Sequence, residues 1–368
     1  MKRTIGLIVN PVAGMGGTVG LKGTDGDSYK RAAELGAKPV TPLRTKDLFE
    51  HIQKKESFNL ITAPGKMGES YVSDFNFATT VVGSLTGETS ARDTKRIAEE
   101  MVSKGIDLLI FVGGDGTARD IYDAVGLKVP VVAVPSGVKV FSAVFAFNTR
   151  AAAEMVDEFI VGTGVVEQEV LDIDEAAFRD NRLAAKLYGY LLVPDVKKYL
   201  QGAKECSEVN ASAVKSKEEV ARYILEQIED DALYLLGPGT TVKAIATAAG
   251  IPKTLLGVDA LAKGQLVGTD LNERAILSLF NRFEKRYIIV TPIGGNGFIF
   301  GRGSKQFTPE VIRLVGRENV IIVGTRDKLV NLESLHVDTG DYHLDQMLAG
   351  YMQVTVGYKE TFKMEVKG

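Results

Sequence analysis

The sequence predicts an α/β protein with two domains, an N-terminal Rossmann-like domain on a parallel sheet and a C-terminal β-rich mixed domain. The chain has 368 residues, which is more than one hydrophobic core usually serves. In the first half, apolar runs alternate with amphipathic segments, as in parallel β-α-β units. Near 161–174 polar and apolar residues alternate singly, which is typical of an antiparallel strand with one wet face. We therefore expect domains 1–162 and 163–368.

Strands of the first domain are predicted where short, nearly continuous apolar runs end in turn-forming residues. The first is "TIGLIVN" at 4–10, which leads into the turn "NPVAGMGG". The others are predicted at 59–64, 78–84, 106–114 and 129–137. In parallel sheets ligands bind beyond the carboxyl ends of the strands, where this chain carries glycine-rich loops.

Helices are predicted between these strands by their amphipathic periodicity. The segment 90–105 begins with Ser90 and Asp93 in capping-box positions. A second helix is predicted at 117–126, and a third runs from Asn148 to about Val161. Strands that alternate with helices in this way predict parallel pairing.

The second domain combines both element types. Strand-like segments lie at 187–194, 232–238, 286–295, 297–303 and 319–325. Helix-like segments lie at 215–230, 240–250 and 272–285. The tail at 350–366 alternates like a final strand or two, and these last strands could also return to the N-terminal domain.

Composition narrows the class of protein. With 44 basic and 47 acidic residues the net charge is −3, so nothing indicates a nucleic-acid or membrane partner. Cys206 is the single cysteine, which excludes an intramolecular disulfide and a cysteine-based zinc site. The apolar run at 5–9 is too short for a signal peptide, and no apolar segment approaches the length of a membrane span. We therefore expect a cytoplasmic location.

The stretch "GGDGT" at 113–117 is the most informative motif of the chain. Gly113 and Gly114 would let main-chain amides approach a phosphate, and a helix that starts near Thr117 would add its positive end. A carboxylate repels a neighbouring phosphate. Its presence here therefore indicates either a Mg²⁺ ion between the two groups or a chemical role for the carboxylate itself. Asp115 could take a proton from an acceptor hydroxyl, or it could simply cap the helix in a tight turn.

Three loops, in the same order along the chain, resemble those of one kinase superfamily. "GGDGT" after an apolar strand is similar to the signature of NAD kinases, of diacylglycerol and sphingosine-type lipid kinases and, more distantly, of phosphofructokinases. "NPVAGMGG" resembles the loop that opens the same superfamily, and "TPIGGNGF" at 291–298 resembles a loop of NAD kinases. With "VPSGVKVFSAVFA" at 134–146 and "TPIGGNGFIFGRG" at 291–303, the whole chain resembles the ATP-NAD kinase-like branch that includes the acetoin catabolism protein X group.

This resemblance implies an NAD-kinase-like two-domain fold, ATP and Mg²⁺ as cofactors, and Asp115 as the catalytic base. No side chain is assigned as a metal ligand. It further implies a small-molecule partner, a nucleotide or dinucleotide, and a homo-oligomeric chain. The residues implied to bind the cofactor or substrate are Asn10, Gly14, Gly16, Gly113, Gly114, Gly116, Thr117, Ser136, Lys139, Thr291, Gly294 and Gly295.

Departures from the NAD kinase pattern leave the acceptor open. NAD kinases hold the dinucleotide with an Asn-Glu or Asn-Asp pair, and the nearby candidate here, Asn272 with Glu273, also reads as a helix start. Ile293 and Gly295 stand where the dinucleotide-binding loop has polar residues. The leading hypothesis is an ATP-dependent small-molecule kinase, with NAD(H) as the first acceptor to test.

Two alternatives stay open, a diacylglycerol-type lipid kinase and a nucleotide-binding sensor without turnover. A lipid kinase is disfavoured by the NAD-kinase-like third loop and by the lack of a marked basic apolar segment. A sensor is disfavoured by Asp115, because a protein that only binds ATP would not need a carboxylate beside the phosphates.

Three further features each have two interpretations. Lys139 could neutralise transferring phosphate charge or be a solvated loop lysine. "LGPGTT" at 236–241 could form a second phosphate nest around Gly239, or Thr240 could cap the following helix. The polar run 336–345 could be a strand that holds a metal ion on one face. It could instead be a polar turn followed by a strand whose polar face lies in solvent.

In that run, a strand would place three potential ligands on one face, namely Asp341, His343 and Asp345.

Overall fold

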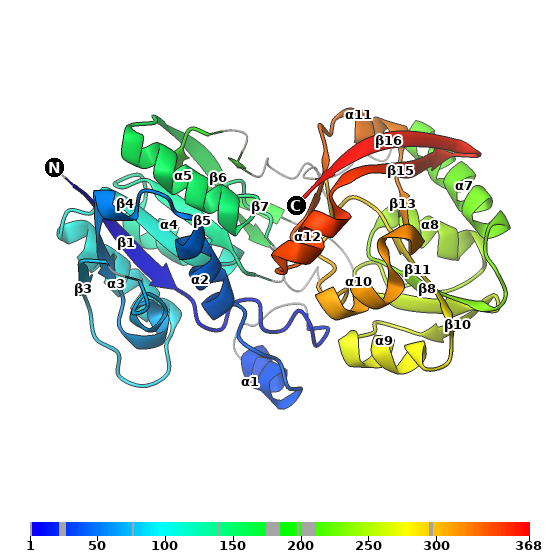
Figure 1. The fold of residues 1–368 in the computed structure, drawn as a ribbon, viewed down its shortest axis with the longest axis horizontal. Coiled ribbons are helices and arrows are strands. Elements are labelled where there is room, and N and C mark those ends of the chain that lie inside the picture. Colours follow the sequence, from blue (N-terminus) through cyan, green and yellow to red (C-terminus); the bar gives the residue numbers. More distant parts are fainter. Residues whose placement is uncertain are drawn as a thin grey trace. The chain divides into compact units, whose positions relative to one another are not determined.

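A computed structural model describes residues 2–21, 27–75, 77–137, 140–173, 185–196, 199–200, 211–293 and 297–368 (Figure 1). Its contacts divide the chain into two compact units. The first unit is Met1–Met15 with Gly23–Ala203, and the second is Gly16–Lys22 with Lys204–Gly368. The contact boundary therefore lies later than the expected one at 162, and a short N-terminal segment belongs to the second unit.

Local packing explains both differences. Strands β6 (Val165–Ile173) and β7 (Ala185–Pro194) form an antiparallel pair. This pair packs against strand β5 (Val131–Pro135) and helix α4 (Asp115–Val125) of the first unit. In the N-terminal segment, the Thr18 carbonyl accepts a hydrogen bond of 3.3 Å from the Glu273 amide. The Gly17 backbone also lies against the Lys305 side chain, so that a side chain at Gly17 would collide with it.

The first unit is built on a parallel five-stranded sheet with the order β3-β2-β1-β4-β5. The strands are β1 (Arg3–Val9), β2 (Phe58–Thr62), β3 (Thr79–Val81), β4 (Leu108–Gly113) and β5 (Val131–Pro135). All five predicted strands are confirmed. The chain adds strands first on one side of β1 and then on the other, so the topological switch point lies between β1 and β4.

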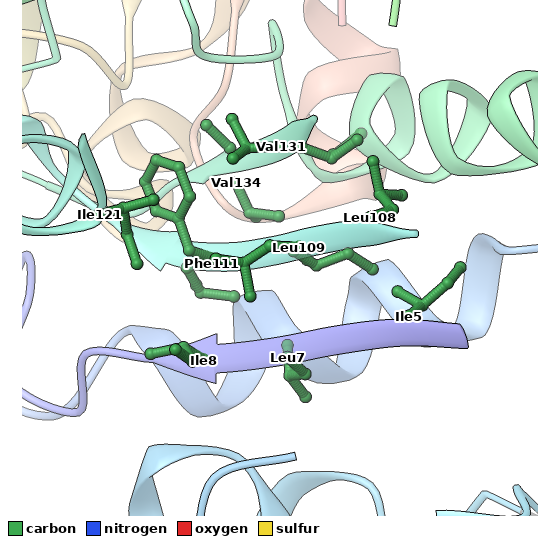
Figure 2. Close-up of a cluster of buried hydrophobic side chains, with 14 of the residues drawn as sticks. Ile5, Leu7, Ile8, Leu108, Leu109, Phe111, Ile121, Val131 and Val134 are labelled. Atoms are coloured by element: carbon green, nitrogen blue, oxygen red, sulfur yellow. The ribbon is translucent and has the colours of Figure 1, made fainter. Parts of the chain in front are cut away.

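Burial explains why these strands are continuous apolar runs. Every residue of β4 and β5 is buried, because both strands lie inside the unit. Figure 2 shows Ile8 of β1, Phe111 of β4, Val134 of β5 and Ile121 of α4 in one cluster of buried side chains.

Capping residues set several helix starts. Ser90 and Asp93 form the predicted capping box before α3 (Ala91–Ser103), and the Asn148 side chain accepts from the Ala151 amide at the start of α5 (Thr149–Val161). The predicted helix at 117–126 is α4 (Asp115–Val125), which begins two residues earlier. The remaining helices of this unit are α1 (Asp27–Glu34), α2 (Thr41–His51) and the 3₁₀ turns Lys55–Ser57, Gly65–Met67 and Glu69–Tyr71.

The second unit carries a mixed nine-stranded sheet with the order β10-β9-β8-β11-β13-β15-β16-β14-β12. Its strands are β8 (Ala232–Leu236), β9 (Asp259–Ala262), β10 (Gln265–Gly268), β11 (Lys285–Val290), β12 (Phe298–Phe300), β13 (Val320–Val323), β14 (Leu335–Val337), β15 (Gly350–Gly357) and β16 (Glu360–Lys367). The two last strands pair with each other inside this sheet, between β13 and β14. The alternative that they return to the sheet of the first unit is therefore wrong.

The second unit contains the three predicted helices, which correspond to α7, α8 and α9, and three that were not predicted, α10, α11 and α12. They are α7 (Ala211–Glu226), α8 (Thr240–Ala248), α9 (Glu273–Phe280), α10 (Pro309–Val315), α11 (Arg326–Val330), α12 (Tyr342–Leu348) and the 3₁₀ turn Arg317–Asn319. Among the helices of the described ranges, not one has the length and hydropathy needed to span a membrane.

Candidate active site

Asn10 joins the turn after β1 to the first turn of α4 at the switch point of the sheet. Its amide donates to the Val112 carbonyl of β4 (3.0 Å), and its side-chain Nδ2 donates to Thr117 Oγ1 (3.0 Å). Its Oδ1 accepts from the Val12 amide (3.2 Å), which holds the turn itself. The structure thus brings two of the predicted site residues, Asn10 and Thr117, into contact.

The glycines that precede α4 have a local structural cause. A Cβ at Gly113 would lie 2.5 Å from Thr117 Cβ, so the side chain of Thr117 excludes any larger residue there. Gly114 precedes the helix in an extended conformation, and no side chain caps this end of α4. The first amides of α4, including that of Gly116, are therefore the kind of donor group that binds phosphate.

The loop after β5 is hydrogen-bonded to the glycine turn that precedes α4. The amides of Ser136 and Gly137 donate to the Gly113 carbonyl at 2.9 and 3.2 Å. Ser136 is almost completely buried. Lys139 lies outside the described residues, so its predicted role stays a prediction.

Asp115 is the first residue of α4, and its carboxylate is held by the segment that follows the β5 loop. Oδ2 accepts from the Phe141 amide (2.8 Å), and Oδ1 accepts from the Ser142 amide (2.9 Å) and hydroxyl (2.6 Å). The residue is only 8% exposed. Donors of this kind favour the charged form of a carboxylate, so this arrangement suits an ionised acid.

Ser142 is not among the residues predicted for the site. Its hydroxyl donates to Asp115 and accepts from the Leu171 amide of β6 (2.9 Å), so it joins three separate segments. The one available signal was a small polar residue inside the apolar run "VFSAVFA". Asp115 therefore has a structural role, and its presence alone does not distinguish an enzyme from a binding protein.

We expect Ser142→Ala to destabilise the first unit by about 1–3 kcal/mol. The substitution leaves the buried Leu171 amide without its acceptor and removes the shortest hydrogen bond to Asp115. Urea unfolding followed by circular dichroism measures the loss. Ser103→Ala is a matched control, because the Ser103 hydroxyl is exposed and bonds only within its own helix, to the Glu100 carbonyl. Equal midpoints for the two variants would contradict the bridging role of Ser142.

The "NPVAGMGG" loop is divided between the units. Gly14 has φ of +81°, a left-handed conformation that favours glycine, and it belongs to the first unit. Gly16 belongs to the second unit, where its carbonyl accepts from the Leu21 amide at 2.8 Å. The predicted role of Gly16 at the phosphate site stays a prediction.

Thr291 follows β11 in the second unit and is 3% exposed. Its Oγ1 has no hydrogen-bond partner in the described part of the chain. The loop continues through Ile293, whose amide donates to the Phe298 carbonyl at 2.8 Å. Gly294 and Gly295 lie outside the described residues, so their predicted contacts with a ligand stay predictions.

Lys328 of α11 also contacts this loop. Its Nζ donates to the Pro292 carbonyl. Burial, with the nearby Lys217, lowers the pKa of Lys328 to about 8. The sequence carried no signal for this contact, because the two residues lie 36 positions apart.

The Asn272–Glu273 pair is a helix start. Asn272 Oδ1 accepts from the Ala275 amide (3.0 Å) and caps α9, while the Glu273 amide donates to Thr18. The capping interpretation of Asn272 is thus confirmed. Its side-chain oxygen is already used by the helix, which weakens the comparison with a dinucleotide-binding pair.

Residues 341–345 form neither the strand on which the metal hypothesis depended nor the wet strand face of the alternative, because they begin helix α12. Asp341 Oδ1 accepts from the Leu344 amide (2.9 Å), so Asp341 caps α12 instead. Asp345 accepts from the amide and hydroxyl of Thr339. The described ranges contain no group of three or more histidine, cysteine or acidic residues suited to a metal ion.

His336 of β14 lies against β12 and beside two cationic side chains. Its ring lies 5.4 Å from the Phe298 ring, and its Nε2 is 3.2 Å from Ser334 Oγ. Burial, with the charges of Lys367 and Arg302, lowers the pKa of His336 to about 4.

We expect this histidine to make the protein acid-sensitive. Unfolded, it titrates near 6.5, so on acidification the unfolded chain binds the proton first. Its stabilising contribution is complete above about pH 6.5 and is lost as the pH falls toward 4, by about 2 kcal/mol at pH 5. In urea midpoints measured from pH 7 to 4.5, His336→Gln should flatten the profile, and His343→Gln, an exposed control, should not. Parallel profiles for His336→Gln and the wild type would contradict this.

Comparison with known families agrees with this architecture. The model of the ATP-NAD kinase N-terminal domain matches residues 5–163, which include the parallel sheet except for the first two residues of β1. The model of the ATP-NAD kinase C-terminal domain matches residues 229–366, which include the nine-stranded sheet except for the last residue of β16. No curated protein matches the chain significantly. Two domain models in their natural order confirm the resemblance carried by the three loops, and the chain belongs to the ATP-NAD kinase family.

Proposed function

We propose that this protein is an ATP-dependent kinase that transfers a phosphoryl group to a hydroxyl group of a small molecule, with NAD(H) as the first candidate acceptor. The observation that carries the proposal is the placement of Asp115. This buried carboxylate stands at the uncapped N-terminus of α4, at the switch point between β1 and β4. Ligands of parallel sheets bind at such points.

The residues around α4 fit a phosphate group. The first amides of α4 have no side-chain cap. They also form the positive end of the dipole of this 11-residue helix, which favours a bound anion. Thr117, fixed by Asn10, lies in the same turn. These residues would hold the phosphates of ATP, and Mg²⁺ bound mainly through those phosphates would neutralise the charge that develops during transfer.

In this proposal Asp115 takes the proton of the acceptor hydroxyl. The amides of Phe141 and Ser142 keep the carboxylate charged and oriented, which a base requires. Because the acid and the phosphate-binding amides belong to one helix turn, their spacing is set by local geometry.

A second candidate function, a nucleotide-binding protein without turnover, is favoured by one observation. Asp115 anchors residues 141–142 through three hydrogen bonds, so a binding protein would also retain it. The experiment must therefore separate binding from transfer.

The test is transfer of label from γ-labelled ATP with Mg²⁺ to a panel of NAD⁺, NADH, nucleosides, sugars, polyols and diacylglycerol. ATP binding is measured on the same protein by calorimetry. Label on NAD⁺ or NADH would support the full proposal, and label on another soluble hydroxyl would change only the acceptor. Label on diacylglycerol would select the lipid kinase. Saturable ATP binding without label on any acceptor would contradict the kinase and select the binding protein.

A further inference from the structure

The glycine-rich segment after β1, residues 10–21, is shared between the two units, and we call it the strap. Its residues up to Met15 belong to the first unit, and those from Gly16 onward belong to the second. The function proposed above uses only Asn10, at the start of the strap. Each half is fixed by contacts of its own, and these contacts indicate a role for the whole segment.

The first half of the strap is fixed beside the proposed phosphate site. Asn10 donates to Thr117, in the first turn of α4, at 3.0 Å. The amides of Ala13 and Met15 donate to main-chain carbonyls of the same turn at 3.3 and 3.4 Å, and both side chains are buried. A ligand held by the α4 amides would therefore lie next to a turn whose conformation is set by several contacts.

The second half of the strap is fixed on the start of α9, within the second unit. The Thr18 carbonyl accepts from the amide of Glu273, the first residue of α9, at 3.3 Å. A Cβ at Gly20 would lie in ordinary contact, at 3.6 Å, with the side chain of Asn272, which caps the same helix. Two contacts therefore join the second half of the strap to the residues that begin α9.

The two halves have no free residue between them. Residues 13–17, which include the junction, are all buried. Gly14 within this stretch has φ of +81°, a conformation that other residues rarely adopt, so the path of the chain there is closely specified. A long flexible linker would let each half move alone. A buried junction of one peptide bond instead transmits a change in one half to the other.

We propose that the strap couples the phosphate site at α4 to the start of α9, so that ATP bound in the first unit stabilises the strap contacts in the second. Binding at α4 requires the turn that begins at Asn10 to stay in one conformation. The contact with Glu273 removes part of the freedom that this turn would otherwise lose on binding. Coupling of this kind is reciprocal, so ATP also protects the Glu273 amide. The proposal rests on the proposed function for ATP as the ligand at α4, but it requires binding only and no turnover.

Glu273→Pro tests the coupling, because it removes the donor to Thr18 and leaves α9 intact. Proline is favoured at the first position of a helix, and Asn272 before it is already extended, with ψ of 173°. In calorimetry we expect this variant to bind ATP with Mg²⁺ about fivefold more weakly than the wild type. Glu273→Gln keeps the amide and controls for the lost charge. Ala91→Pro, at the first position of α3, controls for the proline, since Ser90 before it is also extended. Both controls should bind ATP as the wild type does.

Hydrogen exchange in the protein without ATP tests the coupling independently of any ligand. Asn10→Ala loses the bond to Thr117 in the first unit, and we expect the Glu273 amide to exchange about fivefold faster in this variant. The Leu271 amide, bonded to the Val258 carbonyl at 2.7 Å, is the internal control in the second unit, and its exchange should not change.

Either of two results would overturn the coupling. One is exchange of the Glu273 amide that is unchanged by Asn10→Ala, and the other is equal ATP affinity of Glu273→Pro and the wild type. A protein that bound ATP without transferring label would refute the kinase alone, because neither measurement depends on turnover. A protein that bound no ATP would refute the proposed function, and the exchange measurement would then decide on the strap by itself.

Discussion

Asp115→Asn is expected to lower the rate of phosphoryl transfer from ATP by roughly 100-fold or more, with ATP binding retained. An amide cannot take the proton of the acceptor hydroxyl, and general-base catalysis typically contributes about 10²–10⁴-fold. The α4 amides that would bind the phosphates belong to the main chain and are unchanged by the substitution. A fall in kcat without a matching loss of ATP affinity is thus the expected signature.

The same substitution has a structural cost that the measurement must separate from catalysis. The carboxylate accepts from Phe141 on one oxygen and from Ser142 on the other. Asparagine offers one oxygen and one NH₂ group, so a buried donor would face another donor, at a cost of about 1–3 kcal/mol. Rates should therefore be compared well below the unfolding temperature of the variant.

Asp123→Asn provides the control. It is the same substitution on the same helix, but Asp123 pairs with Lys95 and Tyr188 at the protein surface. Its loss should cost less than about 1 kcal/mol and leave the rate unchanged. If Asp115→Asn kept most of the wild-type rate, Asp115 would act only as the anchor of residues 141–142, and the base would have to be another group.

The parallel sheet was predictable because burial on both sides leaves a direct mark on sequence. Every position of β4 and β5 is buried, so these strands appear as unbroken apolar runs. Helix starts were predictable where a cap is local, as with Ser90 and Asp93, or with Asn148. The approach of Asn10 to the "GGDGT" turn was also predictable, because the carboxyl ends of adjacent parallel strands meet at one edge of the sheet.

The contacts that were missed join residues far apart in the chain. Ser142 reaches Asp115 across 27 positions, and Lys328 reaches Pro292 across 36, without any periodicity to predict either. The α12 error had a different cause. Alternation of Asp341, His343 and Asp345 suits a strand, but the side chain of Asp341 caps a helix, and this local hydrogen bond decided the structure.

The largest loss of stability is expected for Gly301→Ala, in the glycine-rich segment after β12. Gly301 has φ of +89°, where any other residue is strained by about 1–2 kcal/mol. Its Cβ would also overlap the main-chain carbonyl of Asp338. That carbonyl cannot turn aside easily, because the Asp338 amide bonds the Phe300 carbonyl and Phe300 pairs with Val337 of β14. Strain and overlap together should cost about 3 kcal/mol or more.

Gly250→Ala separates the two causes. Gly250 also has a positive φ, of +70°, but a Cβ there would meet no atom within 4 Å, so this variant carries the backbone strain without the overlap. We expect it to lower stability by only about 1 kcal/mol. Hydrogen exchange of the β12 and β14 amides should report the difference directly, because local opening of this pair is what relieves the overlap at Gly301. Similar losses for the two alanine variants, with unchanged exchange in β12 and β14, would show that the contact with Asp338 relaxes freely and that glycine at 301 is needed for its backbone conformation alone.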